Sequence, residues 1–129
     1  MPSNYSIMGL HLRYRLWIAE LNSDITVLRI FDEYMAELAT IKNEPVVKAG
    51  LKIFSDQFTG LRKEIDDLRH EMHLDKMKLA ALSKNSTSKE SKVSIASGHS
   101  AIKKRYVAFR KNFEKAKKEF GVFESKWMK

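Results

Sequence analysis

The chain contains no cysteine and very few residues that would force the backbone out of a helix. The absence of cysteine excludes disulfides and every zinc, iron–sulfur or thiol chemistry that needs a cysteine side chain. The 129 residues include only five glycines and two prolines, and Pro45 is the only proline away from the N-terminus. Because glycine and proline are the residues least favourable in a helix interior, long helices are permitted almost everywhere.

Long hydrophobic runs are also missing, since no stretch approaches the roughly 18 apolar residues that a membrane-spanning helix needs. No basic segment followed by an apolar run opens the sequence, so no secretory signal is expected. We therefore expect a cytoplasmic protein with no membrane partner. The sequence has no Gly-rich phosphate loop, no nucleophile elbow and no His-Glu-x-x-His element, so we expect no enzyme and no cofactor.

The chain does contain three segments in which apolar residues alternate three and four positions apart, as in helices packed in a bundle. The first segment has Leu10, Tyr14, Trp17, Leu21, Asp24, Leu28, Phe31, Met35 and Leu38. The second has Val47, Leu51, Phe54, Phe58, Leu61, Ile65, Leu68, Met72, Asp75, Leu79 and Leu82. The third has Ile95, His99, Ile102, Tyr106, Phe109, Phe113, Ala116, Phe120, Phe123 and Trp127. We call these positions the seam; only Asp24, Asp75 and His99 are strongly polar there.

Polar breaks separate the three segments. Pro45 follows the first segment at a place where a first helical turn tolerates proline. A serine-rich stretch, 83–88, follows the second, and Thr87 and Glu90 have the spacing of a capping box. The sequence predicts one all-α domain over residues 1–129, an up-down-up bundle of three long antiparallel helices at approximately 10–41, 46–82 and 88–126. A third helix that starts only near Ser97 or Ser100 is the alternative.

The polar seam residues suggest one candidate site. Asp75, His99 and the flanking His11 are expected at the same level of the bundle, and imidazole and carboxylate groups from separate helices can bind a transition metal. His73 is a spare ligand. The competing interpretation is a structural polar layer, in which Asp75 pairs with His99, Arg13 or His11, and Asp24 pairs with Arg62 or Arg105.

A basic ridge is the second feature. Residues 84–129 hold thirteen Lys and Arg against four acidic residues, whereas residues 1–83 hold eleven against twelve. Within the basic third, three doublets recur every seven residues and should share one outward face: Lys103, Lys104, Arg110, Lys111, Lys117 and Lys118. Such a ridge can lie along an acidic partner or along phosphates, although a solvated helix face would have the same pattern.

The third feature is extra apolar surface on the first helix, where a second stripe runs beside the seam through Val27, Ile30, Tyr34 and Ile41. A helix that is apolar over most of its circumference is usually buried over most of it. The stripe predicts contact with a partner, unless the groove of the bundle itself covers these residues.

These features lead to three hypotheses. The leading one is a non-catalytic interaction or scaffold protein that self-associates as a dimer through its first helix, or binds another protein there, and presents the basic ridge to an acidic partner. The second is a metal-binding bundle that uses the His and Asp ligands. The third, less favoured, is non-specific binding of nucleic acid.

Overall fold

The computed structural model describes residues 7–84 and 89–127, with side chains described for all of these except 82–96. Three α-helices make up nearly all of this part: α1 (Ile7–Ile41), α2 (Pro45–Lys84) and α3 (Lys89–Trp127). It contains helices and no strand, as the apolar spacing predicts. At a rise of 1.5 Å per residue the helices are about 50–60 Å long. None of these segments combines the length and hydrophobicity of a bilayer-spanning helix.

The connection between α1 and α2 shows why the chain turns where it does. The amide of Lys42 donates to the carbonyl of Leu38 at 2.8 Å and ends α1. Pro45 is the first residue of α2, where its missing N–H costs nothing. The carbonyl of Glu44 accepts hydrogen bonds from the amides of Val47 and Lys48, both at 3.1 Å. Proline thus starts a helix here rather than breaking one.

The core follows the predicted seam. Leu28 and Phe113 are completely buried, as is nearly all of Phe58. Every seam position with a described side chain is buried or half-buried, whereas Leu82 and Ile95 lie outside the described side chains. The possible capping box at Thr87 and Glu90 also lies outside them.

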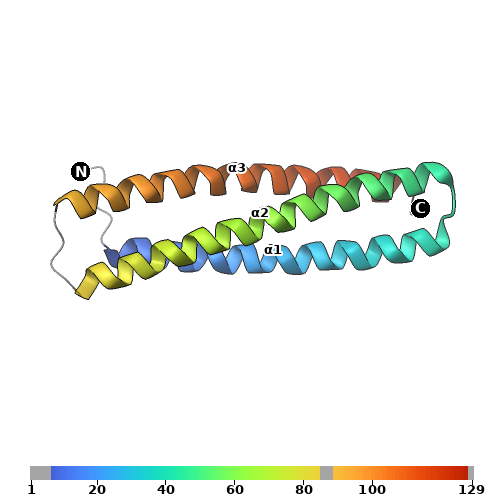
Figure 1. Ribbon diagram of the computed structural model, residues 1–129. Coiled ribbons are helices and arrows are strands. Elements are labelled where there is room, and N and C mark those ends of the chain that lie inside the picture. The colour runs from blue at the N-terminus through green and yellow to red at the C-terminus, as the bar shows by residue number, and fades with distance from the viewer. Residues whose placement is uncertain (1–6, 85–88, 128–129) are drawn as a thin grey trace.

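The three helices form one elongated bundle (Figure 1). The first turns of α1 and α3 and the last turns of α2 gather at one end, which we call the open end; the turn between α1 and α2 lies at the other. Helix α2 packs closely against both of its neighbours. Near the α1–α2 turn, the aromatic rings of all three helices join into one cluster, formed by Phe31, Tyr34, Phe54, Phe58, Phe120 and Phe123.

Candidate functional site

Asp75 accepts a hydrogen bond from Tyr14, a seam residue whose spacing predicted only apolar packing. The hydroxyl of Tyr14, on α1, donates to Oδ2 of Asp75, on α2, at 2.7 Å. Burial raises the pKa of the Tyr14 hydroxyl, and the neighbouring carboxylate of Asp75 raises it further. Tyr14 therefore keeps its proton and remains a hydrogen-bond donor. This contact fixes the level at which α1 meets α2.

At the same level, an aromatic stack holds α1 against α3. The ring of Trp17 lies 5.5 Å from His99 at an interplanar angle of 10°, and 4.8 Å from Tyr106 at 20°. His99 and Tyr106 are seven residues apart on α3, a separation of about 10.5 Å along a helix, which leaves room for one ring between them. Burial lowers the pKa of His99; the positive charges of Arg13 and Lys103 lower it further, while Asp75 opposes them. The neutral imidazole is thus the favoured form within this stack.

A charged network continues the α1–α3 contact one heptad further along. Arg110 of α3 donates to both carboxylate oxygens of Asp24 on α1. It also lies 3.8 Å from Glu20 and 3.2 Å from Glu114. The hydroxyl of Tyr106 donates to Glu20. Hydrogen bonding and the nearby carboxylates raise the pKa of Arg110 despite its partial burial, so the guanidinium stays charged.

This network corrects the expected partners of Asp24. Arg62 instead pairs with Asp32, and Arg105 lies 3.7 Å from Glu71. Both arginines lie on or toward the α2 side of the bundle, whereas Asp24 faces α3. Arg110 was predicted to lie on the outward ridge, but its side chain is only 19% exposed.

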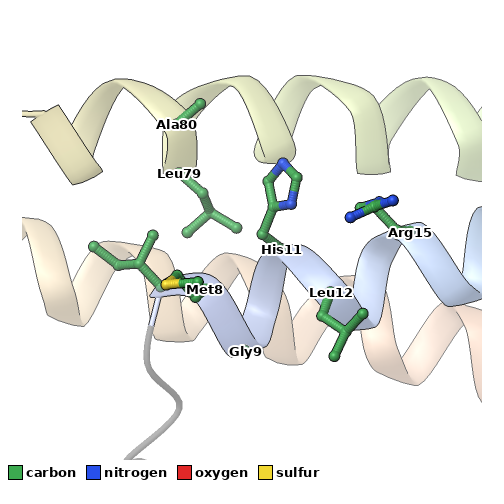
Figure 2. Close-up of a pocket in the computed structure, with 8 residues that line it drawn as sticks. Met8, Gly9, His11, Leu12, Arg15, Leu79 and Ala80 are labelled. Atoms are coloured by element: carbon green, nitrogen blue, oxygen red, sulfur yellow. The ribbon is translucent and has the colours of Figure 1, made fainter.

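The four predicted metal ligands are distributed over different surroundings. Asp75 and His99 lie inside the bundle near Tyr14. His11 points from α1 toward α2 beside Leu79 (Figure 2), and His73 is exposed on α2. In the described part of the chain, no group of three or more His, Asp and Glu side chains could hold a metal ion. The metal site stays a prediction, with no cluster that supports it.

The apolar stripe on α1 divides into two pairs. Val27 and Tyr34 are half-buried and pack against the core, and the Tyr34 ring meets Phe120 edge-on at 6.1 Å. Ile30 and Ile41 remain 53% and 63% exposed. Ile30 borders a shallow groove between α1 and α3 with a volume of about 260 Å³, lined by Ile30, Phe31, Tyr34, Lys117, Phe120, Gly121 and Glu124.

The basic ridge also divides in two. Lys103, Lys104, Lys111 and Lys118 are exposed, which fits the predicted outward face. Arg110 turns toward α1, and Lys117 is half-buried, with its ammonium 3.5 Å from Glu114 and over the ring of Phe113. Arg110 and Lys117, which begin the second and third doublets, therefore face α1 or the α1–α3 groove, whereas Lys103, which begins the first, is exposed.

No family model, curated protein or solved structure matches the chain.

Proposed function

We propose that the chain is a non-catalytic interaction protein that self-associates through the groove between α1 and α3. The contact surface consists of Ile30 and Ile41 together with the exposed edge of Tyr34, and its centre is the shallow groove that reaches Phe120. The proposal includes a cytoplasmic location, with which the absence of cysteine is compatible. The four exposed lysines of the ridge are available to an acidic partner alongside this contact.

The observation that carries the proposal is the exposure of Ile30 at the edge of the aromatic cluster. Ile30 is more than half exposed, while its neighbours Phe31 and Tyr34 already pack against α3. A side chain from a second copy that entered the groove would extend this core instead of creating a separate one. Gly121 lines the groove, and the space beside its Cα is open, since a Cβ there would have no atom within 4 Å.

The proposal includes the up-down-up order of antiparallel helices. Contacts between distant residues support it: Tyr14 meets Asp75 and Asp32 meets Arg62, so increasing numbers on α1 pair with decreasing numbers on α2. Asp24 meets Arg110 and Phe31 meets Phe120, so numbers on α1 and α3 increase together. In this arrangement α1 and α3 run in the same direction, and the shallow groove beside Ile30 and Phe120 lies between them.

Light scattering coupled to size-exclusion chromatography, run over a range of protein concentrations, tests the proposal. We expect the wild-type chain to reach the mass of a dimer and the Ile30→Glu variant to remain a monomer, because the contact would have to bury a charged carboxylate in place of an apolar side chain. Ile30 is a better target than Tyr34, whose replacement would also remove packing against Phe120.

Ile53→Glu is the matched control, since Ile53 is also more than half exposed but lies on α2. It should dimerise like the wild type. A wild-type chain that is monomeric at every concentration, or equal effects of the two substitutions, would overturn the proposal.

A further inference from the structure

A second apolar surface lies at the open end of the bundle and has no part in the proposed dimer. Met8, Leu12 and Leu16 follow one another at four-residue intervals on the outer side of α1, where they are 81%, 53% and 61% exposed. Side chains four residues apart share one face of a helix. Three exposed apolar side chains therefore form a stripe about 12 Å long. We call it the terminal stripe.

The terminal stripe borders a hollow between α1 and α2. The hollow has a volume of about 470 Å³; Met8 and Leu12 of the stripe line it, together with His11 and Arg15 of α1 and Leu79 of α2. Its lining is apolar apart from His11 and Arg15, which lie one turn apart on the α2 side of α1 (Figure 2). The charged side chain at this surface is thus the cation Arg15, and none of the described side chains that line the hollow is acidic.

The parts of the helices around the hollow also carry a net positive charge. Residues 7–19 contain two arginines and no acidic residue. Among the residues with described side chains, 7–18, 71–81 and 97–105 lie toward the open end, and together they hold seven Lys and Arg against two acidic residues. The two acidic residues, Asp75 and Glu71, already contact Tyr14 and Arg105. A net charge of +5, out of the +8 of the chain, therefore lies toward this end.

An occupant of this surface must be apolar and negatively charged. A second copy docked end to end would bring like charges together, which opposes association. Nucleic acid would match the charge, but Met8, Leu12 and Leu16 are aliphatic and offer no ring on which a base could stack. An anionic bilayer meets both requirements, because exposed aliphatic side chains enter the boundary between headgroups and acyl chains while Lys and Arg remain at the phosphates.

We infer that the open end of the bundle binds the surface of an anionic lipid bilayer, with the terminal stripe inserted at the headgroup level and Arg15 and His11 beside it. The bundle stays folded and lies on the membrane without crossing it. The expectation of no membrane partner rested on the length of apolar runs, which bears on spanning a bilayer and not on binding its surface.

Flotation with lipid vesicles tests this inference on the full chain. We expect the wild-type chain to float with vesicles of phosphatidylcholine and phosphatidylserine, to do so less as salt is added, and to remain unbound with phosphatidylcholine alone. The double substitution Leu12→Glu and Leu16→Glu should weaken binding about tenfold or more, because it removes apolar contact and adds negative charge. Both residues are exposed, and circular dichroism verifies that the helices are retained.

The matched control is Ile53→Glu with Val122→Glu, which adds the same charge at two exposed positions, one near the start of α2 and one near the end of α3. These parts of the two helices lie away from the open end (Figure 1). It should retain most of the binding. Equal losses in the two double variants, or equal binding to both kinds of vesicle, would overturn the inference. If duplex DNA displaced the chain from the vesicles and the two stripe substitutions had no effect on binding, the inference would also be overturned, in favour of phosphate binding by the ridge. The Ile30→Glu variant should still bind vesicles, so failure of the dimer and failure of membrane binding are distinguishable.

Discussion

Arg110 joins α3 to two acidic residues of α1 and is the residue whose role was hardest to foresee. In the sequence it belongs to a row of regularly spaced cations, and nothing in that row distinguishes it from Lys103 or Lys117. Its position beside the seam, opposite Asp24, becomes visible only when the relative level of α1 and α3 is known. Tyr14 was missed for a related reason: the spacing records it as apolar, whereas its hydroxyl crosses to Asp75.

Replacing Asp24 with Asn should cost about 2 kcal/mol of unfolding free energy, below the 3–5 kcal/mol of a fully buried pair because Arg110 keeps Glu20 and Glu114 nearby. The change preserves shape and removes the charge that neutralises the guanidinium. Urea unfolding followed by circular dichroism measures it. Asp56→Asn is the control, because Asp56 pairs with Lys52 in solvent and its loss should cost less than about 0.5 kcal/mol. Equal costs for the two substitutions would contradict the role given to Asp24.

At the level of the helices, the sequence predicted most of what is observed. The alternation of three and four identified the buried positions of α1, α2 and α3, and Pro45 marked the start of α2. Helix α1 begins at Ile7, three residues before the predicted boundary, because the seam pattern registers a helix only from its first buried residue, Leu10. The spacing could not predict which residues of the stripe on α1 are buried and which remain exposed, since it does not show whether Tyr34 reaches Phe120.

Two glycines within α2 should respond differently to alanine. A Cβ at Gly60 would have no atom within 4 Å, so Gly60→Ala should stabilise the chain by about 0.5–1 kcal/mol through helix propensity alone. A Cβ at Gly50 would overlap the ring of Phe123, so Gly50→Ala should gain less or lose stability. Thermal and urea unfolding of the two variants measure the difference. If Gly50→Ala were the more stabilising change, the close approach of α3 to α2 at this position would be wrong.

One half of the described bundle holds the phenylalanine-rich cluster around Phe120, and the other holds the hydrogen bond of Asp75 and the stack that contains His99. The sequence also indicates this difference through the positions of Asp75 and His99. What the sequence did not indicate is the concentration of charge at the open end. Helices far apart in the chain contribute to it, and their ends had to be brought together before the excess became apparent. The terminal stripe was missed because Met8 precedes the seam and Leu12 and Leu16 lie away from it.

The stability of the whole bundle should depend on pH through His99. Burial lowers the pKa of His99 below its usual 6.5 in the folded state, so the unfolded chain binds the proton more readily. Stability is therefore fully present above pH 6.5 and falls as the pH drops from 6.5 toward the folded-state pKa. Urea unfolding at several pH values down to about 5, where most carboxylates remain ionised, measures the slope. His99→Phe retains a ring next to Trp17 and should reduce the slope; an unchanged slope would show that another group causes it.

The stack around Trp17 also has an optical consequence. Indole emission responds to the polarity of its surroundings and to quenching by neighbouring groups, and here the two rings stacked on it are an imidazole and a phenol that both belong to α3. Separation of α3 from α1 would remove both rings from the indole at once. The other tryptophan, Trp127, lies at the far end of the bundle. The molecule thus contains a fluorescent reporter of whether its first and third helices are in contact, without any added label.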